Sequence, residues 1–291
     1  FGHSGAVGVG LAVRLATVSS LAFAGLALGS LPGVVVATTA IAAGVSAEAL
    51  YTGLRTRGVV RGPLRDAEPL DPPLDRRGFS GFYVPLALTS VVFLAARPLL
   101  TVGITRSLLL RESLAAWPVI QSFLFLFNSV GLSLQEAVIA LIGESEQRQP
   151  QLRKFVRRVA VVLGVVFLLV AVTPLRDLWF SGVAGLGQHL LPLTAVPMLL
   201  LPLAPMLASF KSLYRGLAVH RRKTIVLTES VTLYTVSLLV LVLLLPRLFP
   251  MQGTTTAALS LVLALGVENL WMRFRLEPSF LPVLFMQKTL H

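Results

Sequence analysis

The stretch EALYTGLRTRG, from Glu48 to Gly58, decides how this chain is organised, because it returns in outline as ENLWMRFRLEP from Glu268 to Pro278. A constant offset of 220 residues separates the two stretches. An internal sequence repeat of this kind indicates two copies of one structural unit. The alternative is chance similarity in a biased composition. The offset pairs Glu48 with Glu268, Leu50 with Leu270, Tyr51 with Trp271, Arg55 with Arg275 and, upstream, Gly33 with Gly253 and Ala37 with Ala257.

The composition is strongly apolar. Of 291 residues, 55% are hydrophobic and 13% are charged, with a mean hydropathy of +0.81, whereas soluble domains carry about 25% charged residues. One soluble core cannot bury this much apolar surface, so we expect a lipid bilayer as the solvent. The net charge of +12 does not predict nucleic-acid binding, because the basic residues lie between apolar runs rather than along one face. The absence of cysteine excludes disulfides and thiolate metal sites.

Long apolar runs predict an all-α polytopic membrane protein with about eight transmembrane helices, since one span needs about 20 apolar residues. Five prolines lie in or beside the fifth and sixth runs, and proline bends a helix, so the sixth span is expected to be kinked. The predicted spans are roughly 7–29, 34–54, 82–104, 114–142, 157–175, 190–214, 224–246 and 252–272.

The Lys and Arg residues are divided unequally between the two sides of these spans. Nineteen of the 25 fall in segments 55–77, 148–158, 211–223 and 273–288, which alternation of the spans places on one side. The other side receives Arg106, Arg111, Arg176 and Arg247. Basic loops face the cytoplasm, which predicts an integral protein of the plasma or inner membrane whose C-terminus is cytoplasmic.

The repeat predicts the domain organisation. An even number of spans separates Arg55 from Arg275, so the two copies share one orientation, as in parallel transporter repeats. We expect residues 1–54 to be the last two helices of an N-lobe, 55–81 a polar cytoplasmic linker, 82–275 a six-helix C-lobe and 276–291 a cytoplasmic tail. The chain would then be the C-terminal part of a twelve-helix protein. The alternative is a complete eight-helix protein whose echo is chance.

Polar and ionisable groups inside spans are costly and are therefore candidates for function. Arg97, deep in the third span, is the main candidate for a charge in a substrate cavity, with a structural ion pair as the alternative. Arg14 in the first span is a possible counterpart. Gln121, Asn128 and Gln135 recur every seven residues on one helix face, which predicts either cavity lining or hydrogen bonding between helices.

Four intramembrane carboxylates are candidates for ion coupling or for structural pairing. Glu48 and Glu268 recur in both copies, which favours a structural role in the repeat. Glu136 lies toward the cytoplasmic end of its span, where pairing with a basic loop is expected. Glu229 lies near the basic turn that ends at Lys223, which favours a charge partner.

No pattern predicts an enzyme. The four histidines are scattered and none lies at ligand spacing from Asp or Glu, so no metal site is predicted. No acid–base pair is recognisable, and no cofactor is expected.

Three local patterns of the chain are FYVPLALTSVVFLAARPLLTVGITRS at Phe82–Ser107, VGLSLQEAVIALIGESEQRQPQLRKFVRR at Val130–Arg158, and YRGLAVHRRKT at Tyr214–Thr224 followed by FPMQGTTTAALS at Phe249–Ser260. These patterns resemble the multidrug/oligosaccharidyl-lipid/polysaccharide (MOP) exporter superfamily, which includes the multidrug and toxic compound extrusion (MATE) transporters. The branch that looks closest is the progressive-ankylosis type, because of the Pro-Leu-Ala-Leu start of the first pattern and its later Arg-Pro.

This resemblance implies a membrane transporter that exports a solute by alternating access, driven in many members by a proton or sodium gradient. The branch implies a small anionic solute such as pyrophosphate, a nucleotide or citrate. Spans 82–104 and 190–214, where the family's coupling carboxylates are expected, contain no Asp or Glu, which speaks against a cationic-drug exporter. The alternatives are a lipid-linked saccharide flippase of the same superfamily and a non-transporting membrane fragment or scaffold.

Overall fold

The computed structural model describes residues 4–29, 31–61, 76, 80, 83–84, 98–142, 149–221, 223 and 225–276. The chain divides into two compact units, Phe1–Asp75 (unit 1) and Arg76–His291 (unit 2). The described residues form helices and one isolated bridge between Leu108 and Gln252, with no strand among them. The predicted all-α fold class is therefore confirmed.

Seven helical stretches in the described part of the chain are long and apolar enough to cross a membrane. The predicted third span, 82–104, lies mostly outside the described residues, which show helix at its end over 98–105. Length and composition thus identify a helical integral membrane protein. The seven stretches are Gly8–Leu28, Gly33–Gly58, Leu110–Gln135, Pro150–Val172, Pro192–His220, Ile225–Leu248 and Gly253–Leu276.

Unit 1 is a hairpin of two helices, α1 (Ser4–Leu28) and α2 (Gly33–Arg61). Helix α1 ends before Gly29, whose φ of 61° is the left-handed conformation that commonly terminates helices at glycine. The two helices approach closely through small residues. A Cβ atom at Gly44 would overlap Val18, and its distance to the carbonyl oxygen of Arg14 would be 3.2 Å.

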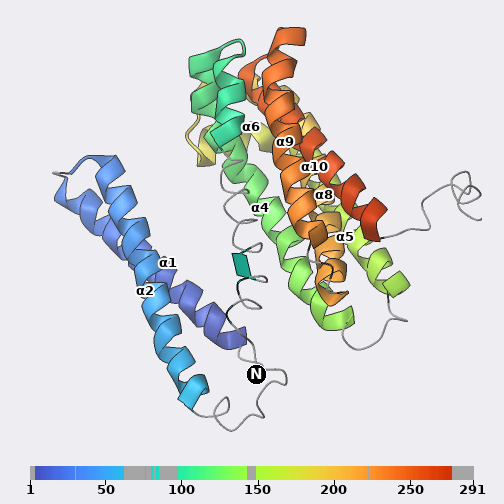
Figure 1. The fold of residues 1–291 in the computed structure, drawn as a ribbon. Helices are drawn as coiled ribbons and strands as arrows, with labels where there is room; N and C mark the ends of the chain where they lie inside the picture. Colours follow the sequence, from blue (N-terminus) through green and yellow to red (C-terminus); the bar gives the residue numbers. More distant parts are fainter. Residues whose placement is uncertain are drawn as a thin grey trace, which may run out of the picture. The chain divides into compact units, whose positions relative to one another are not determined.

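Unit 2 is an up-and-down bundle (Figure 1) of α4 (Leu110–Ile142), α5 (Gln149–Val172), α7 (Pro192–Leu200), α8 (Leu203–His220), α9 (Ile225–Leu248) and α10 (Gly253–Leu276). Three short elements connect α5 to α7: α6 (Leu175–Asp177), the π-helical turn η2 (Leu178–Val183) and the 3₁₀ turn η3 (Gln188–Leu190). A break at Leu201 and Pro202 separates α7 from α8. The sixth predicted span is therefore interrupted at a proline, as expected.

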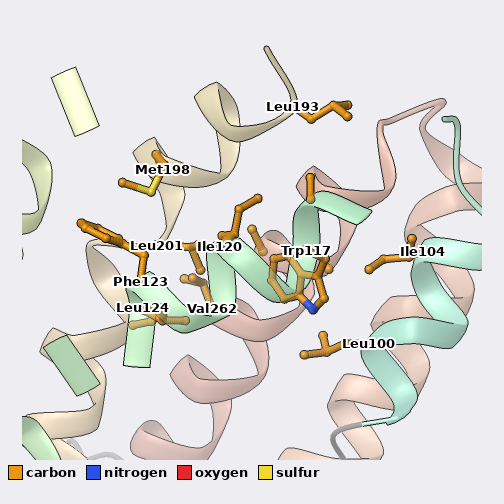
Figure 2. Packing of buried hydrophobic residues seen from close by; sticks show 14 of the residues in the cluster. Leu100, Ile104, Trp117, Ile120, Phe123, Leu124, Leu193, Met198, Leu201 and Val262 are labelled. Atoms are coloured by element: carbon orange, nitrogen blue, oxygen red, sulfur yellow. The ribbon is translucent and has the colours of Figure 1, made fainter. Parts of the chain in front are cut away.

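The interior of unit 2 contains two apolar clusters, one toward each end of the bundle. The upper cluster, at the end of the bundle where α4 begins, packs Trp117, Ile120 and Phe123 of α4 against residues of α7 and α10, as Figure 2 shows. Phe123 also meets Phe167 of α5 edge-on, with ring centroids 5.1 Å apart. The lower cluster joins the C-terminal parts of α4, α8 and α10 to the N-terminal parts of α5 and α9. These contacts fix how the five helices are arranged around the polar residues between the clusters.

Helices α4 and α8 pack closely because glycine lies on both contact surfaces. A Cβ atom at Gly131 would lie 3.3 Å from Ser209 Oγ, and one at Gly216 would collide with the side chain of Val138. We therefore expect Gly216→Leu to lower the free energy of unfolding by about 1–3 kcal/mol, the usual cost of overpacking. Thermal unfolding of the purified protein in detergent measures this loss.

Gly266→Ala is the matched control, because nothing lies within 4 Å of a Cβ atom at Gly266 of α10. Alanine in a helix interior is more favourable than glycine by up to about 1 kcal/mol, so this variant should unfold at the wild-type temperature or above it. A Gly216→Leu variant as stable as the wild type would contradict the close approach of α4 and α8.

Candidate functional site

A polar layer lies between the two apolar clusters of unit 2. On each contributing helix the layer follows the last residue of one cluster and precedes the first residue of the other. Its side chains are buried, except that Asn128 is half-buried. The polar layer consists of Asn128 on α4, Ser209, Lys211 and Ser212 on α8, Ser230 on α9, and Glu268 and Asn269 on α10.

An ion pair between Lys211 and Glu268 forms the centre of this layer. The ammonium Nζ of Lys211 lies 2.8 Å from Oε1 of Glu268, and the two side chains are 7% and 0% exposed. Nζ also donates a 2.8 Å hydrogen bond to Oε2, and it lies 5.4 Å from the ring centroid of Tyr234 on α9. A charge this deep requires a partner, and here α8 and α10 supply one to each other.

Glu229 of α9 belongs to a second, more exposed cluster near the end of α10. Its carboxylate accepts hydrogen bonds from Arg275 Nη2 at 3.0 Å and from Trp271 Nε1 at 3.2 Å. The Arg275 guanidinium also lies over the Trp271 ring, 5.8 Å from its centroid. Glu229 is thus a charge partner, and its partners among the described residues lie on α10.

In unit 1, Glu48 of α2 pairs with Arg14 of α1, with Nη1 and Oε2 3.4 Å apart and side-chain exposures of 42% and 29%. At the offset of 220 residues, Glu48 corresponds to Glu268 and Arg14 to Tyr234. Each copy therefore places a cation against the repeated carboxylate. In unit 1 the cation is Arg14, which belongs to the hairpin itself. In unit 2 the cation is Lys211 of α8, which lies over the ring of Tyr234.

The helix ends of the two copies coincide at the same offset. Helix α1 ends at Leu28 and α2 begins at Gly33, while α9 ends at Leu248 and α10 begins at Gly253. The surroundings of the two equivalent glycines differ. A Cβ atom at Gly253 would lie 2.8 Å from Ile104 Cγ2 and 2.8 Å from Ser113 Cβ, whereas one at Gly33 would meet no described residue within 4 Å.

The basic residues of unit 2 gather at one end of the bundle. The C-terminal ends of α4, α8 and α10 and the starts of α5 and α9 meet there, because consecutive helices run in opposite directions (Figure 1). Arg106, Arg111, Arg176 and Arg247 lie toward the other end. The basic end carries Arg153, Lys154, Arg157, Arg158, Arg215, Arg221, Lys223, Arg273 and Arg275.

Comparisons of this chain with protein-family models, with curated proteins and with solved structures found no match. Within the described ranges, no group of three His, Asp or Glu side chains is arranged to hold a metal ion.

The remaining candidate residues are only partly placed. Gln121, Asn128 and Gln135 lie along α4 and are half-buried, and the Oδ1 atom of Asn128 is buried without a hydrogen-bond partner in the described structure. Arg97 lies outside the described residues, and Glu136 lies in α4 but its side chain is not described. These two assignments remain predictions.

Lys211 and Tyr234 are not among the site residues predicted from the sequence. The sequence places Lys211 with the basic residues that flank the spans, and its packing against α10 distinguishes it from them. One signal was present in the sequence. Lys211 lies nine residues before the end of α8 at His220, or about 14 Å at 1.5 Å per residue, which is too deep for a charge in the loop.

Proposed function

We propose that this chain is part of a two-lobe secondary transporter that exports a small anionic solute by alternating access, as the MOP-type resemblance implies. The observation that carries the proposal is the repeated hairpin. Helices α1 and α2 in unit 1 and α9 and α10 in unit 2 have coincident ends at the loop and carry equivalent carboxylates, each paired with a cation. Parallel repeats of helix groups are characteristic of transporters that work by alternating access.

The charge distribution supports an orientation and a type of solute. The basic end of unit 2 is assigned to the cytoplasm by the positive-inside rule, which places the C-terminus there as well. Cations also outnumber carboxylates among the buried and half-buried groups of α8 and α10. This excess suits an anionic solute better than a cationic drug.

Two other functions remain candidates. A lipid-linked saccharide flippase of the same superfamily would also need cationic groups, because its cargo carries phosphate. A non-transporting scaffold would retain the helices and the ion pairs but would move no solute. Transport assays with soluble anions and with lipid-linked saccharides distinguish the three functions.

The test uses the complete reading frame, including whatever precedes Phe1, purified and reconstituted into proteoliposomes. We expect an in-frame extension of roughly 140 residues with four apolar spans, which is about the length that four spans and their loops need. Radiolabelled pyrophosphate, citrate and a nucleotide are each assayed with proton and sodium gradients of either direction. Transport of one of these anions would support the proposal. Movement of a lipid-linked saccharide alone would favour the flippase, and no movement of either cargo would favour the scaffold.

A further inference from the structure

Among the described side chains, the polar layer of unit 2 and its edge include two cations, Lys211 and Arg215, and one carboxylate, Glu268. Lys211 and Glu268 balance each other at 2.8 Å. Arg215 follows Lys211 by four residues on α8, a spacing that brings two side chains together on one face of a helix. The charges of Glu268 and Arg215 both act on the Lys211 ammonium. Two cations of α8 and one carboxylate of α10 therefore contribute charge in this part of the described structure.

Arg215 has hydrogen-bonding capacity that its surroundings do not use. Its Nε atom is buried and has no hydrogen-bond partner among the described residues. The ion pairs of the described ranges involve other residues. The side chain as a whole is half-buried, so part of it reaches the surface of the bundle. A buried N–H group without an acceptor is unfavourable, and an external acceptor would relieve that cost.

Phosphate is the acceptor that fits these two cations best. A guanidinium presents a planar fork of N–H donors that matches phosphate oxygens bidentately. A lysine ammonium adds a compact charge with three donors. Because Lys211 is four residues before Arg215 on the same side of α8, one oxyanion could contact both groups.

Glu268 acts against such an anion in two ways. Its carboxylate already accepts a 2.8 Å hydrogen bond from the Lys211 ammonium, which a bound anion would otherwise accept. Its negative charge also repels a second anion, because the dielectric constant of the interior is low. Removing this charge would take away the carboxylate that lies 2.8 Å from the buried ammonium.

We propose that Lys211 and Arg215 form a binding site for a phosphate group, and that Glu268 is the built-in competitor of that phosphate for Lys211. The inference deepens the proposed function, because it gives the charged group of the solute a place in unit 2. The phosphate can belong to a soluble solute or to a lipid headgroup, since both present the same oxygens.

The experiment measures binding of inorganic pyrophosphate to the full protein in phosphatidylcholine nanodiscs by isothermal titration calorimetry. Glu268→Gln is expected to raise the pyrophosphate affinity about 3- to 10-fold, and Arg215→Gln to lower it about 10-fold or more, the effect of losing one charge-assisted contact. Pyrophosphate should also raise the unfolding temperature of Glu268→Gln more than that of the wild type, because it replaces the missing counter-charge.

Two matched controls test whether the effects are local. Glu229→Gln removes a carboxylate that is paired with Arg275 outside the polar layer. Arg176→Gln removes a cation that is paired with Asp177 at the other end of unit 2. Both variants should bind pyrophosphate with wild-type affinity. If Glu268→Gln is too unstable to purify, the double variant Lys211→Met/Glu268→Leu serves instead, because it removes both charges together, and it should lose pyrophosphate binding.

Nanodiscs that contain phosphatidylglycerol identify the source of the phosphate. Competition of this lipid with pyrophosphate, with the same order of variants, would assign the site to a lipid headgroup. Binding that is unaffected by the lipid would assign it to a soluble solute.

Two results would overturn the site. One is equal pyrophosphate affinity in the wild type, Glu268→Gln and Arg215→Gln. The other is the absence of any effect of either phosphate source on the wild type and on Glu268→Gln. Anion transport that is identical in these variants would contradict the site and leave the proposed function standing. The expected binding pattern in a protein that transports none of the solutes would support the site and count against the proposed function.

Discussion

Replacing Glu268 by Leu should destabilise unit 2 by about 3–5 kcal/mol, because it removes the carboxylate that pairs with the buried ammonium of Lys211 at 2.8 Å. The carboxylate is completely buried and its partner is 7% exposed, so water cannot replace the lost interaction. Lys211→Met should cost a similar amount, since it leaves the carboxylate unpaired. The double variant should recover most of the loss, because both charges leave the interior together and apolar side chains fill the space.

Thermal unfolding of the single and double variants in one detergent completes this double-mutant cycle. Glu229→Leu is the matched control, since its ion pair with Arg275 has side-chain exposures of 32% and 39%. A surface pair of this kind contributes about 0–1 kcal/mol. A double variant no more stable than either single variant would show that the two charges do not stabilise each other, and the polar layer would then need another explanation.

Arg97→Ala should lower transport of the anionic solute about 10- to 100-fold while leaving membrane insertion intact. Arg97 lies deep in the third predicted span, far from the basic loops, and an arginine at that depth requires a cavity, a carboxylate or an anionic ligand. Losing a contact between a charged group and the solute costs about 1.5–3 kcal/mol, which is about 10- to 100-fold in rate at constant solute concentration. Uptake of the solute into proteoliposomes measures the loss.

Arg106→Ala is the control for this experiment. Arg106 follows the helical residues 98–105 and is exposed, so it should be dispensable for transport. Equal rates for the wild type and Arg97→Ala would remove Arg97 from the solute pathway. A variant that fails to insert would instead indicate that Arg97 forms a structural ion pair, the alternative reading of this residue.

The membrane-spanning helices could be predicted because each carries its own signal. Apolar runs of sufficient length identify a span without knowledge of its neighbours, and the interruption between α7 and α8 falls at Pro202, where the loss of a backbone donor disrupts the helix. The repeat was visible for the same reason, since Glu48 and Glu268 lie at a constant offset in the chain itself. Side-chain partners carry no such signal.

The amino-acid sequence alone determined the all-α class, the apolar spans, the repeat and the unequal distribution of basic residues. These properties depend on the composition and order of residues within each segment, because each span satisfies its own backbone hydrogen bonds in the bilayer and is oriented by the basic residues beside it. Only the tertiary structure decided that Glu268 pairs with Lys211, that Glu48 pairs with Arg14, and that the Nε atom of Arg215 is buried without a hydrogen-bond partner among the described residues. The reason is that an ion pair forms between whichever opposite charges packing brings within about 4 Å, and that proximity depends on how the helices are arranged and rotated.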